Sequence, residues 1–115
     1  MAFVSNVLVA LACVPTAIPA AERAQHFGTA RALLNELAVE RTDLVDGYAF
    51  RFTPDKLLQL TQFIDSERKC CPFMTFELHM APEAGPIWLR MKGPEGTRAV
   101  MQAELSLSTS CECGA

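Results

Sequence analysis

The five cysteines of this 115-residue chain are the residues best suited to chemistry. Four of them form two close pairs, Cys70 with Cys71 and Cys111 with Cys113, and the fifth is Cys13. An odd number prevents complete disulfide pairing within one chain. Neither pair has the repeated Cys-x-x-Cys spacing of a zinc ribbon. Thiolates favour soft ions such as Hg(II), As(III), Cu(I) or Zn(II), so the cysteines predict soft-metal or thiol redox chemistry.

The vicinal pair of Cys70 and Cys71 is the strongest of these signals. Adjacent cysteines rarely bond to each other, because the ring would strain the intervening peptide, so the pair is expected to offer two thiolates or to bond two different partners. Arg68 and Lys69 would lower the thiol pKa, whereas a helix C-terminus would raise it, and the sequence leaves this balance open. The alternative is that both cysteines are small hydrophobic core residues.

Cys13 lies at the end of an apolar run, residues 7–14, that predicts a buried strand ended by Pro15. Side chains at strand ends often line a site. We therefore expect Cys13, Cys70 and Cys71 to converge on one three-thiol acceptor site. The alternative for Cys13 is a place in the core, where free cysteine is common.

The second pair, Cys111 and Cys113, lies in a small and polar tail, residues 108–115, that is predicted to be flexible. A mobile dithiol can capture a thiophilic ion or exchange with a disulfide at another site, so this pair is predicted to assist the first. The alternative is a frayed terminus whose thiols have no role. Residues 1–107 are predicted to form a single domain.

Other polar residues are weaker candidates. His26 is expected on the polar side of a helix and His79 near a strand end, so both are predicted to be surface residues. Glu67 could orient a thiol one helical turn away, but the commoner alternative is a solvated pair with a neighbouring arginine. The segment 93–97 lacks the lysine and spacing of a phosphate loop and predicts a helix start.

The elements that must position the cysteines alternate in the order β-α-β-α-β-β-α. They predict an α+β fold with a single open, mostly antiparallel sheet of about four strands and helices packed mainly on one face. Pro72 disfavours helical geometry at Cys71, so the second helix should end at the vicinal pair. Thr53 and Pro54 are expected at the N-cap and first position of that helix. The predicted strands are 7–14, 48–52, 73–80 and 87–91, the predicted turns are 46–47 and 82–86, and the predicted helices are 19–40, 53–69 and 97–105.

Composition excludes several classes of function. Half of the residues are hydrophobic and 20% are charged, which is enough apolar content for a folded core. The net charge of −3 and the lack of a basic run argue against nucleic acid or an anionic membrane as a partner. Residues 1–21 end like a signal peptide but have no positive start, so a cytoplasmic protein is predicted, with export as the alternative.

The segment 67–78, which contains Glu-Arg-Lys-Cys-Cys-Pro-Phe, resembles a group of small, largely uncharacterised bacterial proteins that share a Cys-Cys-Pro-Phe core, a strand pair and a Gly-Pro-Glu-Gly helix start. Segments 47–52, 85–89 and 93–96 match the rest of that pattern, as does Cys13 followed by a helix start. The resemblance covers about residues 10–105 and excludes the tail cysteines. It implies an association with heavy-metal, including mercury, resistance and favours the three-thiol site.

The leading prediction is a protein that binds a soft heavy-metal ion such as Hg(II), with transfer of the ion as a further role. Cys13, Cys70 and Cys71 would form the acceptor site, with Cys111 and Cys113 as the auxiliary pair. One alternative is a redox or organometal-processing enzyme in which Cys70 or Cys71 is the catalytic nucleophile. Another is a structural or partner-binding domain in which the cysteines are incidental.

Overall fold

The computed structural model describes Val14, residues 17–105 and Leu107. Cys13, Cys111, Cys113 and the predicted tail lie outside the described residues, as does all of the predicted first strand except Val14. The elements are α2 (Ala20–Ala32), a π-helical turn η2 (Leu33–Leu37), β1 (Glu40–Leu44), β2 (Gly47–Phe52), a 3-10 turn η3 (Pro54–Lys56), α3 (Leu57–Cys70), β3 (Thr75–Met80), β4 (Ile87–Lys92) and α4 (Thr97–Glu104).

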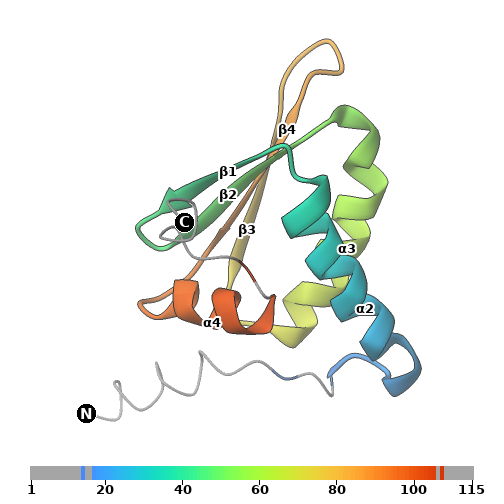
Figure 1. Ribbon diagram of the computed structural model, residues 1–115, viewed down its shortest axis with the longest axis vertical. Helices are drawn as coiled ribbons and strands as arrows, with labels where there is room; N and C mark the ends of the chain where they lie inside the picture. The colour runs from blue at the N-terminus through green and yellow to red at the C-terminus, as the bar shows by residue number, and fades with distance from the viewer. Residues whose placement is uncertain (1–13, 15–16, 106, 108–115) are drawn as a thin grey trace.

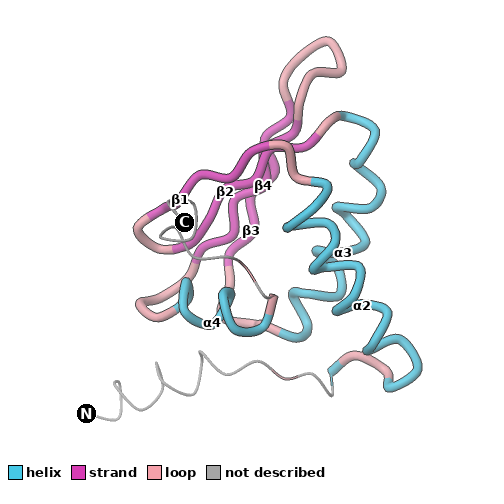
Figure 2. The backbone as a smooth tube through the Cα atoms, viewed as in Figure 1, coloured by secondary structure: helices cyan, strands magenta, loops and turns pink. Residues whose placement is uncertain are grey.

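The four strands of the described residues form one antiparallel sheet in the order β1-β2-β4-β3. This confirms the predicted α+β class with an open sheet. Along β4, buried Ile87, Leu89 and Met91 alternate with more exposed side chains, as expected when one face of a sheet is covered. The helices lie on that side of the sheet, and the loop between β3 and β4 projects away from them (Figures 1 and 2).

Strand β1 was not predicted from the sequence. The first helix was expected to continue to about residue 40, and the structure corrects this. The helical segment ends at Leu37, and Ala38 is extended with ψ of 130°. The chain then forms an edge strand, Glu40–Leu44, which a turn at residues 45–46 connects to β2. This strand is mostly exposed and polar, so it carries none of the alternating apolar pattern that identifies a half-buried strand.

The start of α3 differs in detail from the prediction. Pro54 stands in the first turn as expected, but that turn is the 3-10 segment η3. Thr53 makes no side-chain cap to the backbone, and its hydroxyl instead donates a hydrogen bond to Asp55. The proline therefore starts the helix through its fixed backbone angle, without the predicted cap.

The end of α3 is as predicted. Cys70 is the last helical residue, and Cys71 leaves the helix with φ of −121° and ψ of 77°. Pro72 follows and excludes a further turn. The chain then enters β3, which pairs with β4 through the predicted turn. Helix, proline and strand together hold the two cysteines at the junction between the helical layer and the sheet.

Candidate functional site

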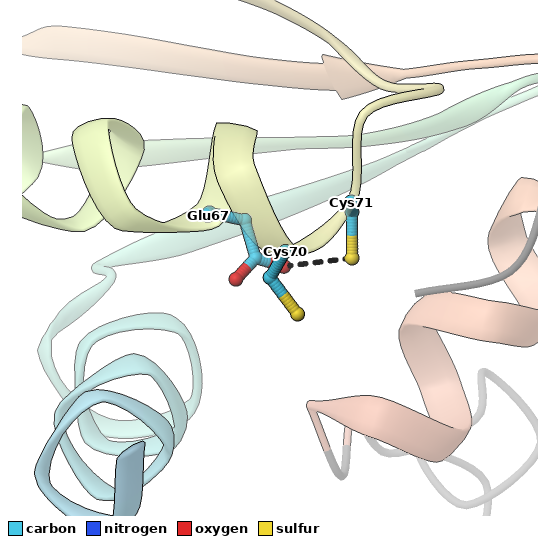
Figure 3. A group of neighbouring side chains, drawn as sticks. All are labelled: Glu67, Cys70 and Cys71. Atoms are coloured by element: carbon cyan, nitrogen blue, oxygen red, sulfur yellow. Dashed lines mark hydrogen bonds between the residues drawn. The ribbon is translucent and has the colours of Figure 1, made fainter. Parts of the chain in front are cut away.

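The last turn of α3 brings together Glu67, Cys70 and Cys71 (Figure 3). Residues three and four positions apart lie on one face of a helix, so this spacing directs the carboxylate toward both cysteines. One donor atom from each residue lies within 4.8 Å of the other two. All three residues are buried, with exposed fractions of 1%, 1% and 2%. The group therefore has the composition and proximity of a ligand set.

Both oxygens of the Glu67 carboxylate have a neighbour. Oε1 lies 2.9 Å from Nε2 of His26, which comes from α2. Oε2 lies 3.6 Å from Sγ of Cys71, a separation at which a reduced thiol donates a hydrogen bond to the carboxylate (Figure 3). Glu67 thus connects a histidine of one helix with a cysteine at the end of another.

These contacts correct two predictions. His26 is buried and not a surface residue, and Glu67 is buried and not part of a solvated pair with arginine. Glu67 lies beside the Cys71 sulfur, and the thiol-orienting role considered for it stays a prediction for the reduced chain. A signal for His26 is present in the sequence, because it precedes the buried Ala30 and Leu33 by four and seven positions and so shares their helix face.

Aromatic rings hold the His26 imidazole in place. The Phe63 ring stacks on it with centroids 6.0 Å apart, and the Phe27 ring meets it edge-on at 5.1 Å. His26 also lines an open groove of about 360 Å³ between α2 and α3, whose other walls include Gln25, Gln59 and Gln62. The ring therefore lies between the buried Glu67 and a polar groove.

The two cysteines belong to a small apolar cluster. Its buried members are Ile18, Cys70 and Cys71, and we call them the sulfur cluster. Phe27, Phe73 and Met74 are partly buried and pack against it. The two sulfurs therefore have the Glu67 carboxylate on one side and hydrocarbon and thioether surface on another.

The pKa of the Cys70 thiol is raised to about 11. Burial is the main cause, because it disfavours the charged thiolate, and the neighbouring Glu67 carboxylate adds to it. The backbone hydrogen bond with Val14 opposes the shift. Neither Arg68 nor Lys69 offsets it: both are exposed, and Lys69 lies 3.7 Å from Asp65. The sequence left open whether basic neighbours or the helix end decide the thiol pKa; in the structure, the surroundings of Cys70 favour its neutral thiol over the thiolate.

The two adjacent cysteines differ in state. Cys70 carries a free, buried thiol, whereas Cys71 is disulfide-bonded. The two are therefore not bonded to each other, in agreement with the strain expected for adjacent cysteines. Any role for both sulfurs as ligands requires the Cys71 disulfide to be reduced first.

The remaining predicted candidates are away from this group or outside the described residues. The convergence of Cys13 with the vicinal pair, and the assistance of Cys111 and Cys113, stay predictions for that reason. His79 is exposed on β3, as predicted. The segment 93–97 leads into α4, as predicted for a helix start.

Comparisons with protein-family models, with curated proteins and with solved structures find no match to this chain. Among the helices of the described residues, none has the length and apolar character needed to cross a bilayer. The geometry at the end of α3 is therefore the basis for a functional proposal.

Proposed function

We propose that the reduced chain binds a soft metal or metalloid ion, such as Hg(II), between Cys70 and Cys71, with the Glu67 carboxylate beside them. The single observation that supports this most is the burial of three donor groups within 4.8 Å of one another. Two sulfurs and one carboxylate suit a soft ion, whereas Ca²⁺ or Mg²⁺ requires six or more oxygen ligands.

Charge supports a cation in this position. Thiolates and a carboxylate in a buried site carry negative charge that is costly without a compensating partner. Burial, and after it the Glu67 carboxylate, raises the pKa of Cys70 when no cation is present. A bound cation reverses this effect, because it stabilises the thiolate form that coordinates it. The site is therefore built from groups that a soft cation would stabilise together.

The three remaining cysteines belong to the same proposal. Cys13 would be the third thiol of the acceptor site, and Cys111 with Cys113 would capture the ion and pass it on by thiolate exchange. A reducing compartment such as the cytoplasm would keep these thiols available. Heavy-metal resistance is the context that the sequence resemblance suggests for such binding.

The redox alternative is favoured by one observation, the disulfide at Cys71 next to the free thiol of Cys70. Thiol–disulfide exchange needs an attacking thiolate, however, and a thiol with a pKa of about 11 is almost entirely protonated at neutral pH. Activated cysteines have a lowered pKa. We therefore rank ion binding above nucleophilic catalysis by Cys70.

Titration of the phosphine-reduced protein with Hg(II), As(III), Cu(I) and Zn(II) tests the proposal. The double variant Cys70→Ser/Cys71→Ser should lose more affinity than the roughly 10- to 100-fold that accompanies loss of an outer-shell partner. The matched control is Cys111→Ser/Cys113→Ser, which removes the same number of thiols and should retain the high-affinity site. Equal binding by wild type and the Cys70/Cys71 variant would overturn the proposal.

A further inference from the structure

The disulfide of Cys71 has three candidate partners in the chain, because Cys70 is free and the sequence contains five cysteines. The N–H of Val14 donates a hydrogen bond of 2.6 Å to the carbonyl oxygen of Cys70. That N–H belongs to the peptide bond between residues 13 and 14, and that carbonyl belongs to the peptide bond between residues 70 and 71. Cys13 and Cys71 therefore flank the same backbone hydrogen bond.

This arrangement has the spacing that a disulfide needs. Consecutive Cα atoms are about 3.8 Å apart, and neighbouring hydrogen-bonded segments of extended backbone lie about 5 Å apart. The Cα atoms of a disulfide are usually separated by roughly 4.4–6.8 Å. Two cysteines on either side of one backbone hydrogen bond are therefore close enough to be joined.

The segment after Val14 stays against the same two residues. The N–H of Ala17 bonds back to the carbonyl of Val14, at 2.9 Å, and Ile18 is a buried member of the sulfur cluster. The tail has a different anchor. Leu107, the last described residue before the tail cysteines, is buried among the hydrophobic side chains that pack on the sheet. The described contacts therefore favour Cys13 over the tail cysteines as the partner of Cys71.

We infer that the Cys71 disulfide is formed with Cys13 and is a redox gate on the metal site, the second part of which rests on the proposed function. In the oxidised chain, two of the three acceptor thiols are bonded to each other, and Cys70 is the acceptor thiol that is left beside Glu67. A disulfide also carries no charge, so the oxidised site avoids the cost of buried thiolates when no cation is present.

A small dithiol opens this gate. Its two S–H groups supply two electrons and two protons, the S–S bond between Cys13 and Cys71 becomes two thiols, and the reductant becomes a disulfide. All three acceptor thiols can then lose their protons to solvent and bind the ion. The oxidised chain is the closed state of the site, and the reduced chain is the open state.

Tryptic mapping of the unreduced protein tests the pairing. Cleavage after Arg23, Lys69, Arg90 and Arg98 places Cys13 in peptide 1–23, the vicinal pair in peptide 70–90 and the tail cysteines in peptide 99–115. Mass spectrometry should find peptide 1–23 linked to peptide 70–90. The same link should form in Cys70→Ser, which leaves a single cysteine in peptide 70–90. A link between peptides 70–90 and 99–115 in its place would overturn the inference.

Titration with Hg(II), with iodide as the competing ligand, tests the gate. The background is Cys111→Ser/Cys113→Ser, which has no tail thiols to bind the ion. The phosphine-reduced chain should bind Hg(II) at least about 100-fold more tightly than the unreduced chain, because two sulfur ligands outweigh an outer-shell partner. Equal affinity of the reduced and unreduced chains would overturn the gate.

Cys13→Ser in the same background is the matched variant. It leaves Cys71 without the inferred partner, so Hg(II) affinity should no longer depend on reduction. Circular dichroism checks its fold, and the other two measurements decide the inference even if this variant does not fold. Failure of the reduced chain to bind Hg(II) would overturn the proposed function, whereas the mapped bond between Cys13 and Cys71 would still stand.

Discussion

Two buried clusters in this protein differ in what they contain. The large cluster packs against the sheet and is hydrocarbon apart from the tyrosine hydroxyl and two thioethers; its buried members are Ala30, Leu33, Leu34, Tyr48, Phe50, Phe52, Leu60, Phe63, Ile87, Leu89, Met91, Met101, Leu105 and Leu107. The sulfur cluster consists of Ile18, Cys70 and Cys71 and adjoins the buried Glu67. The difference in composition leads us to expect most of the stability from the first cluster, whereas the proposed ion binding is assigned to the second.

The largest effect on stability is expected in the large cluster. Phe50 is completely buried on β2, so Phe50→Ala should lower the free energy of unfolding by about 3–5 kcal/mol. Val45→Ala is the control, because Val45 is 96% exposed and its truncation should change stability by less than about 0.5 kcal/mol. Urea unfolding measures both. A loss below about 1 kcal/mol for Phe50→Ala would show that the large cluster is not the main source of stability.

A smaller effect on stability, with a functional consequence, is expected at His26. His26→Ala leaves Oε1 of the buried Glu67 without its partner, which should cost about 1–3 kcal/mol of unfolding free energy. It should also weaken Hg(II) binding by roughly 10- to 100-fold, because an outer-shell partner of the donor group is lost.

The other histidine provides the matched control for this change. His79→Ala, on the exposed side of β3, should alter neither stability nor Hg(II) affinity. Denaturant titration and metal titration of the two variants are the measurements. Equal stability and equal Hg(II) affinity of His26→Ala and His79→Ala would show that His26 does not support the proposed metal site.

The pH dependence of Cys70 tests the electrostatics of the sulfur cluster. Its folded-state pKa of about 11 lies above the ordinary value of 9.0, so alkylation by iodoacetamide should rise only as the pH approaches 11. Glu67→Gln should move the midpoint to lower pH, since it removes a negative charge that disfavours the thiolate. Glu104→Gln should shift it in the same direction by less, because Glu104 is a weaker contributor. A wild-type midpoint at or below 9 would contradict this description.

The smallest effect is expected at a polar contact of the large cluster. Gln102 donates a hydrogen bond of 2.6 Å from Nε2 to the hydroxyl of Tyr48. Tyr48→Phe should cost about 1 kcal/mol of unfolding free energy through loss of this bond. Its Hg(II) affinity should match that of wild type. A large change in metal affinity would mean that the two clusters are energetically coupled.

Local sequence signals were sufficient for much of the fold and for the two cysteines. Pro72 fixes the end of α3 at Cys70 through a steric effect on the preceding residue, and the β3–β4 hairpin follows from two apolar runs around a proline-containing turn. Strand β1 could not be recognised in the same way. It is an exposed edge strand, defined by pairing with β2 and not by its own apolar pattern.

The polar partners of the site depend on tertiary contact. His26 and Glu67 are 41 positions apart and meet because α2 and α3 pack together. Nothing in the spacing of either residue within its own helix specifies that pairing. The raised pKa of Cys70 follows from the same packing, because its main cause is burial. Sequence patterns therefore located the sulfurs but not the buried carboxylate–histidine pair beside them.

The most direct test of the central claim is X-ray absorption spectroscopy of the phosphine-reduced chain with one equivalent of Hg(II). The predicted result is at least two sulfur ligands in wild type and in Cys111→Ser/Cys113→Ser, with loss of that sulfur coordination when Cys70→Ser/Cys71→Ser is added to Cys111→Ser/Cys113→Ser. An unchanged spectrum on adding Cys70→Ser/Cys71→Ser to the variant without the tail cysteines would contradict the assignment of the buried group at the end of α3 as the metal site.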